Sequence, residues 1–447
     1  MIMDRRRFLV LGSAAAASPV TAAPISALGV DGAQFGLRPG SADDQSRAFQ
    51  CAVDETTRNR VPLAIAPGSY RVGGLRLPAH AHIVGVRGAS TLLFSDGPSL
   101  MTAAHADHVT LSGLVLDGLR RRLPDRRALV QIENGRRLKI SECEIVAAGG
   151  TGLGCIAVDG AITDTLVSDS ADVAIHSFDA RALLIARNTI VGAGNNGIQV
   201  WRGRAGNDGS MVLDNRIEAI DNRAGGSGQY GNAVNVFRAG NVIVRGNRIR
   251  NCAFSGVRGN AASNIHMEGN SISDTREVAL YAEFGFEGAL IANNTVDGAA
   301  IGVSVTNFNQ GGRLASVHGN IIRNLLPKRP AGTDPDDGAG IGIAVEADTA
   351  VTGNVIENAP TAGMILGWGH HLRDVAVTGN VIRRTDIGIG VSVSNGAGSA
   401  LIANNVIADI KRGAILGMDR KRIVTGDLIR GGAERYANLT VSGNRVR

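Results

Sequence analysis

The chain has 447 residues, of which 60 are glycine, while the aromatic residues number only 10 Phe, 4 Tyr and 2 Trp. A hydrophobic content of 44% with 19% charged residues excludes a disordered chain, the lack of a three-residue glycine period excludes collagen, and 4 Cys exclude a disulfide-stapled scaffold. The formal net charge of +6 is too small to indicate a nucleic acid or a membrane surface as a partner.

The N-terminus predicts an export signal. Asp4-Arg5-Arg6-Arg7-Phe8-Leu9 precedes a short apolar run, Val10 to Ala17, and small residues up to Ala22. The stretch resembles a twin-arginine signal, which implies the Tat translocase as a transient partner and a periplasmic or secreted protein. An ordinary Sec signal is the alternative. Cleavage near Ala22 lowers the charge to +4, and the run is too short for stable membrane insertion, so residues 1–28 are assigned to signal and linker.

Residues 29–100 are assigned to an N-terminal cap and the first coils of the fold. A short helix is predicted after Asp43 and Asp44, either of which can cap its first turn. Its apolar residues are expected to plug the open end of the fold that follows. These residues are Ala48, Cys51, Ala52 and Val53.

An asparagine repeat dominates the remaining residues, 101–447. Each asparagine follows an apolar residue by three positions and precedes Ile or Val by two. The asparagines are Asn188, Asn215, Asn247, Asn270, Asn294, Asn320, Asn354, Asn380, Asn405 and Asn444. The same frame is predicted upstream at Leu114/Asp117/Leu119, Ile140/Cys143/Ile145 and Ile162/Thr165/Val167, and Asp427 is a candidate further rung.

Alternating β-formers lie between successive asparagines, as in Gly197-Ile198-Gln199-Val200-Trp201. This period of two indicates strands, and the units of about 22 to 26 residues contain no helical pattern. Such units must stack on their neighbours, which predicts a solenoid of parallel strands continuous with residues 29–100. The asparagines are expected at one corner, in the left-handed conformation and hydrogen-bonded from coil to coil.

The pattern resembles the pectate-lyase-like superfamily. Phe35 to Gly40, Asp43 to Asp54 and Pro67-Gly68-Ser69-Tyr70-Arg71-Val72 are similar to its N-terminal motif, capping helix and first coil. The resemblance implies an all-β fold, a right-handed single-stranded parallel β-helix of about 12 to 14 coils with a short N-terminal capping helix. With the signal, the chain also resembles a family of Tat-translocated bacterial repeat proteins.

The motifs of well-defined superfamily enzymes are incomplete. Gly369-His370-His371 is the nearest match to the polygalacturonase histidine motif, but its acidic partners are missing from the preceding coils. Residues 122–127 have the Arg-x-Pro-x-x-Arg spacing of pectate lyases in an early coil, where a basic turn is favoured. The fold that the resemblance implies therefore does not identify the function.

Outward positions of the second strand predict a groove that binds a sugar chain. One column contains His176, Gln199, Asn235, Arg258, Tyr281 and Ser304, and the next contains Phe178, Trp201, Phe237, Asn260, Glu283, Thr306 and Glu346. Aromatic rings stack on sugars, and amide, Arg and carboxylate groups bind hydroxyls. The predicted substrate-binding residues are His176, Gln199, Trp201, Asn235, Phe237, Asn260 and Glu346. Alternatively, the rings pack under loops and the amides form structural ladders.

Arg258, Tyr281 and Glu283 are the predicted catalytic residues. In β-elimination on a uronate, Arg258 would neutralise the carboxylate and Tyr281 would move the proton. In hydrolysis Glu283 would be the acid, with Glu346 about two rungs away. A surface salt bridge between Arg258 and Glu283 is the alternative.

No cofactor is predicted. Asp334-Pro335-Asp336-Asp337-Gly338 clusters carboxylates but lacks the alternating oxygen spacing of a Ca²⁺ loop, which favours an acidic turn. Two hypotheses result: an exported β-helix that binds an acidic, uronate-containing polysaccharide and cleaves it as a lyase or hydrolase, and a non-catalytic structural or carbohydrate-binding solenoid of the cell envelope.

Overall fold

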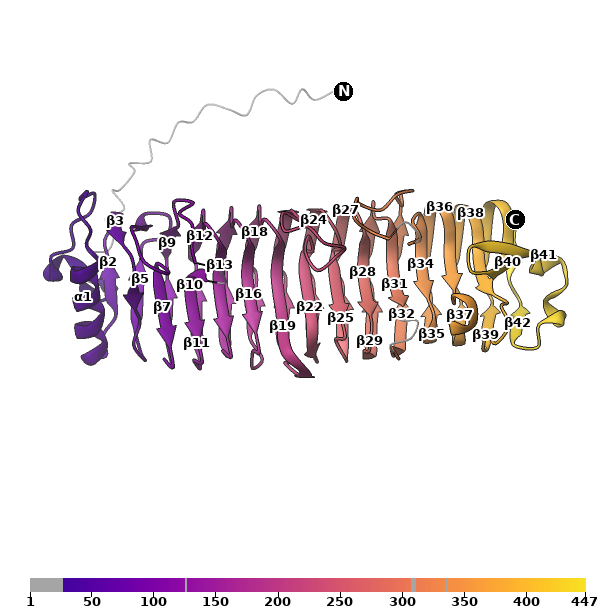
Figure 1. The fold of residues 1–447 in the computed structure, drawn as a ribbon, viewed down its shortest axis with the longest axis horizontal. Coiled ribbons are helices and arrows are strands. Elements are labelled where there is room, and N and C mark those ends of the chain that lie inside the picture. Colours follow the sequence, from indigo (N-terminus) through magenta and orange to yellow (C-terminus); the bar gives the residue numbers. More distant parts are fainter. Residues whose placement is uncertain (1–26, 125–126, 307–310, 335–336) are drawn as a thin grey trace, which may run out of the picture.

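The protein is an elongated stack of β-coils with one helix at its N-terminal end (Figure 1). The computed structural model describes residues 27–124, 127–306, 311–334 and 337–447. The predicted export signal at Arg5 and Arg6 therefore lies outside the described residues. No helix in these ranges is long and apolar enough to cross a membrane.

Each coil contributes strands to three faces of the stack. Face 1 is a 16-stranded parallel sheet. Faces 2 and 3 are two rows of parallel strands that join into a single 27-stranded sheet through long strands near the C-terminus. This arrangement is a right-handed parallel β-helix, as the repeat predicted.

Face 1 opens each coil. Its strands are β1 (Val30–Asp31), β2 (Leu63–Ile65), β5 (His82–Gly85), β8 (Thr110–Ser112), β11 (Leu138–Ser141), β14 (Gly160–Thr163), β17 (Leu184–Ala186), β20 (Met211–Leu213), β23 (Ile243–Arg245), β26 (Ile265–Glu268), β29 (Glu287–Ala292), β32 (Arg313–His318), β35 (Ala347–Thr352), β37 (Arg373–Thr378), β39 (Ala400–Ala403) and β42 (Leu439–Ser442).

Face 2 follows the asparagine corner. Its strands are β3 (Gly68–Val72), β6 (Ser90–Phe94), β9 (Leu114–Asp117), β12 (Glu144–Val146), β15 (Leu166–Ser168), β18 (Thr189–Val191), β21 (Arg216–Ile220), β24 (Arg248–Cys252), β27 (Ser271–Thr275), β30 (Thr295–Asp297), β33 (Ile321–Arg323), the first parts of β36 (Val355–Leu366), β38 (Val381–Ser392) and β40 (Val406–Asp419), and β43 (Arg445–Val446).

Face 3 completes the coil. Its strands are β4 (Leu75–Arg76), β7 (Met101–Ala104), β10 (Ala128–Glu133), β13 (Thr151–Ile156), β16 (Val173–Phe178), β19 (Asn196–Asn207), β22 (Val234–Gly240), β25 (Val257–Asn260), β28 (Val278–Glu283), β31 (Ile301–Thr306), β34 (Ile341–Val345) and the last parts of β36, β38 and β40. The antiparallel strand β41 (Arg422–Asp427) forms a hairpin with β40.

The helix α1 (Ser46–Arg58) covers the N-terminal end of the stack (Figure 1). The prediction that Asp43 or Asp44 is the N-cap residue was wrong: Gln45 takes that position, and Asp44, one residue before it, accepts a hydrogen bond at Oδ1 from the amide of Ser46 at 2.9 Å. Ala52 and Val53 are buried against the first coils, as expected. Phe49 is buried with them, whereas Cys51 faces solvent, so the prediction that Cys51 plugs the end was wrong. The helix period places Cys51 on the outer face.

The corner asparagines form a continuous buried ladder. In each step, Oδ1 of one asparagine accepts bonds from the backbone amide and the Nδ2 of the asparagine in the preceding coil, as between Asn294 and Asn270 at 2.9 and 3.0 Å. The predicted ladder is therefore confirmed. The left-handed conformation lies instead on the residue before each asparagine, such as Gly269 (φ 62°) and Asn293 (φ 56°). The corner thus separates the two tasks: one residue takes the left-handed conformation, and the asparagine after it makes the ladder hydrogen bonds.

Two predicted rungs were wrong. Leu111 pairs with Ile140, and Glu144 pairs with Val115, so Leu114 rather than Asp117 takes the corner position. The connection between β9 and β10 is long, and the predicted frame was therefore three residues out of register. Asp427 belongs to the antiparallel hairpin, where it accepts bonds from the amides of Ala414 and Ile415.

The end of the ladder lies beyond that hairpin. Asn405 donates from its backbone amide to Oδ1 of Asn444 at 3.0 Å, which makes Asn444 the last rung. The chain between them contains β41 and the 3-10 helices η4 (Leu428–Arg430) and η5 (Ala433–Arg435). One apolar cluster of mainly Ile, Val, Leu and Ala extends through the stack from Leu37 to Leu439.

Candidate functional site

The outward side chains of face 3 form the predicted columns. His176 pairs with Gln199, Asn235 with Arg258, and Arg258 with Tyr281, while Phe178, Trp201, Phe237, Asn260, Glu283 and Thr306 follow in the second column. The first column continues through Ser304, Ala344, Ile365, Gly390 and Leu416. Adjacent rungs are about 4.8 Å apart, so these side chains contact one another in series.

Four rings at the N-terminal end of these columns form an aromatic ladder, which we define as His176, Phe178, Trp201 and Phe237. All four are half-buried. The ring centroids of His176 and Trp201 are 5.9 Å apart, as are those of Trp201 and Phe237. These spacings are those of favourable edge-to-face and offset contacts. The ladder therefore presents partly open aromatic surface over adjoining coils.

Buried amides hold the aromatic ladder in place. Trp201 donates from Nε1 to Oδ1 of Asn235 at 3.0 Å, and Nδ1 of His176 lies 2.7 Å from Oε1 of Gln199. Gln199 and Asn235 are both buried, so they support the rings from below. Burial lowers the pKa of His176, which keeps the imidazole neutral near pH 7.

A cavity of about 890 Å³ adjoins the aromatic ladder, and we call it the edge cavity. Its charged lining consists of Asp179, Arg181, Arg202, Arg204 and Asp208. The strand β19 continues past Trp201 and supplies Arg202 and Arg204 from one segment.

Gly203 fixes that segment against the aromatic ladder. Its amide donates to Oδ1 of Asp179 at 3.1 Å, and a Cβ at this position would touch the Phe178 ring at 3.4 Å. The Gly203 carbonyl accepts a bond from Arg238 at 3.2 Å, and the Arg238 guanidinium lies 4.7 Å from the Phe237 ring centroid. Arginines and open aromatic surface therefore lie together.

Arg202 and Asp208 are incompletely paired inside the edge cavity. Their Nη1 and Oδ2 atoms are 3.8 Å apart, while Nε of Arg202 and Oδ2 of Asp208 are buried without a hydrogen-bond partner among the described residues. Burial raises the pKa of Asp208, although the Ser210 amide bonds its other oxygen. Such unpartnered buried atoms are rare in folded proteins, and these two have almost no surface open to the cavity.

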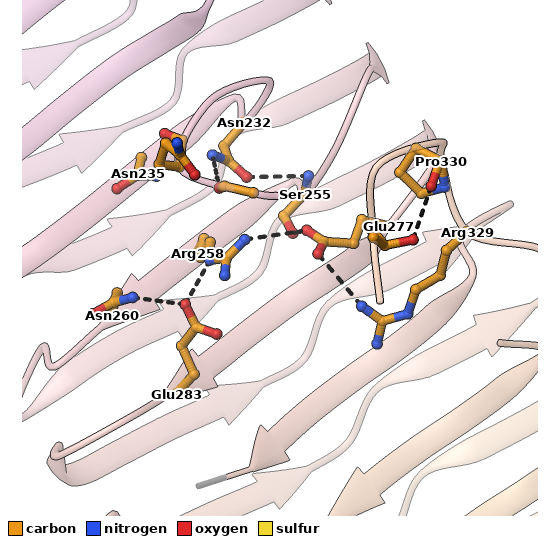
Figure 2. A network of polar contacts seen from close by, with 12 residues as sticks. Asn232, Asn235, Ser255, Arg258, Asn260, Glu277, Glu283, Arg329 and Pro330 are labelled. Atoms are coloured by element: carbon orange, nitrogen blue, oxygen red, sulfur yellow. Dashed lines mark hydrogen bonds and ion pairs between the residues drawn. The ribbon is translucent and has the colours of Figure 1, made fainter. Parts of the chain in front are cut away.

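A buried ionic network occupies the middle of face 3 (Figure 2). Arg258 donates from Nε to Oε1 of Glu283 at 2.6 Å, and its Nη1 lies 3.5 Å from Oε2 of Glu277. Arg329 approaches the other oxygen of Glu277 at 3.4 Å, and Ser255 donates to Oε2 at 2.6 Å. These four ionic groups and their hydrogen-bonding partners form one connected set.

The chain closes over this ionic network. Arg258 is 9% exposed and Glu283 is 3% exposed. A Cβ at Gly228 would lie 1.6 Å from Nη1 of Arg258, so the backbone of the segment between β21 and β22 lies directly against the guanidinium. The predicted surface salt bridge is therefore a buried one, and Asn260 adds a third contact by donating to Oε1 of Glu283 at 2.8 Å.

The electrostatics of the predicted catalytic residues match a structural role. Burial would lower the pKa of Arg258, but Glu283 and Glu277 outweigh this effect and raise it. Burial also raises the pKa of the Tyr281 phenol, and the charge of Glu283 adds to this shift. The phenolate needed for proton abstraction is disfavoured. The structure therefore brings the three residues together with Arg258 and Glu283 buried, while Tyr281 is half-buried. Catalysis by them stays a prediction.

Sequence reasoning missed Glu277 and Arg329. Glu277 stands just before β28 rather than at an outward strand position, and Arg329 comes from the long connection between β33 and β34. An acidic residue directly before the strand that contains Tyr281 and Glu283 was the available signal for Glu277. No periodicity could predict which coil Arg329 would reach.

A second cavity, of about 680 Å³, lies toward the C-terminal end of face 3. Tyr281 and Glu346 line it, and Glu346 is itself buried. Its lining also includes Ala344 and Ile365 of the first column.

Metal ligation has little support in the described chain. No group of three or more His, Cys, Asp or Glu side chains in these ranges is arranged to hold a metal ion. In the acidic turn predicted as a weak Ca²⁺ candidate, Asp337 instead pairs with Arg329 at 3.3 Å, and residues 335 and 336 lie outside the described ranges.

Comparison with known proteins supports the fold class. Residues 206–382 match the family model described as a right handed beta helix region. A search of curated protein sequences found no match. The solved structures with this fold include PfbA, a surface adhesin of Streptococcus pneumoniae, which is 16% identical over 87% of this chain and 91% of that chain, with a TM-score of 0.50.

Two enzymes of polysaccharides are also similar in fold. The mannuronan C-5 epimerase A-module of Azotobacter vinelandii is 14% identical over 93% of this chain and 99% of its own, with a TM-score of 0.44. The catalytic unit of an α-1,3-glucanase of Streptomyces thermodiastaticus is 16% identical over 97% of this chain and 70% of that chain, with a TM-score of 0.46. At these identities the likeness concerns fold alone.

Proposed function

We propose that the protein binds an acidic polysaccharide along face 3. One observation carries the proposal: the half-buried aromatic ladder lies directly beside the arginine-lined edge cavity. Trp201 and Phe237 provide surfaces on which sugar rings stack, and Arg202 and Arg204 provide charged donors for carboxylates. A uronate-containing chain fits both features.

The predicted catalytic residues favour binding of the polysaccharide without cleavage. Arg258 and Glu283 neutralise each other below the surface, and the environment of Tyr281 opposes its ionisation. The predicted lyase or hydrolase activity therefore receives no support from the Arg258 site, and the non-catalytic carbohydrate-binding hypothesis is preferred.

A panel of uronate-containing and neutral glycans tests the proposal. We expect saturable binding of uronate oligosaccharides by calorimetry, and Trp201→Ala or Phe237→Ala should weaken it about 2- to 10-fold by removing one stacking surface. Phe284→Ala is the matched control, since Phe284 is an exposed aromatic residue outside the ladder. Arg202→Ala should weaken uronate binding and leave neutral glycans unaffected.

Two outcomes would contradict this proposal. If the Trp201→Ala variant bound uronate oligosaccharides as tightly as the wild type, the aromatic ladder would not be part of the binding site. Release of unsaturated products absorbing at 232 nm, or of reducing ends, would show cleavage and would require a catalytic centre. Retention of that activity in Arg258→Ala would place the centre elsewhere.

We further propose export by the twin-arginine route, on the basis of the pattern at residues 4–9. Replacement of Arg5 and Arg6 by lysine keeps the charge and removes the paired guanidinium groups. Cell fractionation should then show the protein retained in the cytoplasm. Unchanged export of the double variant would favour an ordinary Sec signal.

A further inference from the structure

Face 2 carries a row of exposed apolar residues toward the C-terminal end of the stack. We call this row the apolar stripe and define it as Ile321, Val355, Val381 and Val406, which lie in register on four consecutive coils. Each follows its ladder asparagine directly, and the four residues are 36–49% exposed. Neither cavity of face 3 includes them in its described lining. The apolar stripe is therefore sheet surface that is open to a partner.

The strands of face 2 do not require an apolar residue at this position. In the preceding coils the same position carries polar residues, namely Thr189, Arg216, Arg248, Ser271 and Thr295. Threonine favours strands much as valine and isoleucine do, so strand propensity alone does not explain the change. Contiguous exposed apolar residues on one face are typical of a surface that associates with another one.

Charged residues beside the apolar stripe alternate in sign from coil to coil. From its first coil to its last they are Arg323, Glu357, Arg383 and Asp409. Within one copy they pair along the stack, since Arg383 lies 3.5 Å from Glu357 and 3.3 Å from Asp409. Their side chains are nevertheless 31–57% exposed. The surface therefore presents a fixed order of charges to a partner.

This order of charges is complementary to itself in reverse. If two copies meet face to face with their stacks antiparallel, the first coil of the apolar stripe faces the last coil of the partner's stripe. Arg323 then lies opposite the partner's Asp409, and Glu357 lies opposite the partner's Arg383. With the stacks parallel, the charged residues of the two copies would lie on opposite sides of the stripe and would not meet. The antiparallel arrangement alone matches both the apolar and the charged residues.

We propose that the apolar stripe joins two copies of the chain in a weak antiparallel dimer. Val355 would cover the partner's Val381, and Ile321 would cover the partner's Val406, which removes apolar surface from water. The charges set the alignment more than the affinity, because exposed ion pairs contribute little. This inference does not depend on polysaccharide binding, which concerns face 3.

The size of the opposed surfaces predicts how tightly the dimer associates. In this alignment six coils face each other, from that of Thr295 to that of Arg445. A rung spacing of about 4.8 Å and a width of about five residues give roughly 460 Å² for each copy. A stable complex buries about 800 Å² for each partner, and weak, transient complexes bury less. The dimer should therefore form at micromolar to millimolar concentrations and dissociate on dilution.

Sedimentation velocity of the full chain over a concentration series tests the association. We expect a shift from monomer toward dimer as the concentration rises. Val355→Thr with Val381→Thr keeps strand-forming residues but removes the central apolar contacts, and it should weaken the dimer about tenfold or more. Val191→Thr is the matched control, since Val191 is 38% exposed on face 2 but lies outside the apolar stripe. It should leave the association unchanged.

An exchange of charges tests the alignment. Glu357→Arg sets a second positive charge against the partner's Arg383, and Arg383→Glu sets a second negative charge against the partner's Glu357. Each variant alone should therefore associate more weakly than the wild type. An equal mixture of the two variants should regain the association, because opposite charges face each other in a mixed dimer. Circular dichroism checks the fold of each variant.

Cysteine cross-linking tests the antiparallel order. The background is Cys51→Ser, in which the three remaining cysteines are buried. Ile321→Cys and Val406→Cys proteins, treated together with a short bismaleimide, should form a cross-linked dimer. Neither protein should cross-link to itself, since equivalent positions would lie three rungs apart, about 14 Å along the stack.

Three results would overturn the inference. The proposal fails if the chain stays monomeric at millimolar concentration, or if the Val355→Thr, Val381→Thr variant associates as tightly as the wild type. It also fails if the Ile321→Cys protein cross-links to itself as readily as to the Val406→Cys protein. Glycan binding is measured on face 3 with separate variants, so its failure stays distinguishable from a failure of the dimer.

Discussion

Arg258 and Glu283 form a 2.6 Å ion pair that is almost completely removed from solvent. The pair joins β25 to β28, and Glu277 and Ser255 extend it toward the segment that contains Arg329. It therefore links two long connections to the coils beneath them. Such a pair specifies one arrangement of the covering chain, although its net contribution to stability is modest while both partners are present.

Removal of one partner should be costly. Glu283→Gln or Arg258→Ala leaves a buried charge uncompensated and is expected to destabilise the fold by about 3–5 kcal/mol. Glu218→Gln, which breaks an exposed pair with Arg250, is the control and should cost less than about 1 kcal/mol. Denaturant unfolding measures both. A wild-type unfolding curve for Arg258→Ala would contradict the structural role.

The asparagine ladder supplies a second prediction. Asn294→Ala removes the acceptor for two donors of Asn270 and the donor to Oδ1 of Asn320, all of them buried. The unsatisfied groups should cost about 2–4 kcal/mol. Asn444→Ala removes similar bonds at the partly exposed end of the ladder and should cost less. Thermal unfolding compares the two variants, and an equal loss would mean that position in the ladder is unimportant.

The sequence predicted this ladder because one residue type recurs at one position of every coil. The pairing of face 3 followed from the same frame, as the contact of Arg258 with Tyr281 shows. Where a long connection intervened, the frame failed: Leu114 rather than Asp117 occupies the corner, and Asp427 turned out to belong to a hairpin. Connections of irregular length carry no periodic signal.

The candidate site was less predictable for the same reason. Periodicity shows which side chains point outward, but exposure depends on the connections that fold back over them. Gly228 closes on Arg258, and Arg329 reaches Glu277 from a coil farther along the chain. Conversely, Ile365 pairs with Ala344 and lines a cavity together with residues of the β40–β41 hairpin, and the sequence period does not predict that hairpin.

At Gly269, the residue before the ladder asparagine Asn270, a substitution should be sensitive to conformation rather than to space. Gly269 has φ 62°, and a Cβ there would meet no atom of the described chain within 4 Å. Gly269→Ala is expected to cost about 1 kcal/mol because an L-residue is strained in this region. Gly269→Asn should cost less, since Asn293 and Asn404 adopt this conformation in their own coils. Equal unfolding temperatures for the Ala and Gly proteins would contradict the argument.

The cysteines should differ sharply in reactivity. All four are free, and burial raises the pKa of Cys143 to about 11 and of Cys155 and Cys252 to about 12. Only the exposed Cys51 should react with a thiol reagent in the native protein, and four should react in denaturant. Cys51→Ser should abolish the native reaction. Rapid labelling of that variant would show that the coils open.

The pH dependence of stability provides a test of the edge cavity. Burial raises the folded-state pKa of Asp208, so the folded protein holds this proton more tightly than the unfolded chain. The associated stabilisation is present below the ordinary aspartate pKa and is lost as pH rises through the folded-state value. Asp208→Asn should remove this loss and make the protein more stable than the wild type at neutral pH.

Asp164 provides a control with the opposite sign. A bidentate bond from Arg187 lowers the pKa of this carboxyl, so its stabilisation is present above the ordinary aspartate pKa and is lost as pH falls through the folded-state value. Asp164→Asn should therefore be less stable than the wild type at neutral pH, with the difference shrinking in acid. Thermal unfolding of the three proteins from acid to neutral pH measures both effects. If Asp208→Asn followed the wild-type curve throughout, burial would not raise the pKa of the Asp208 carboxyl, which would contradict the argument.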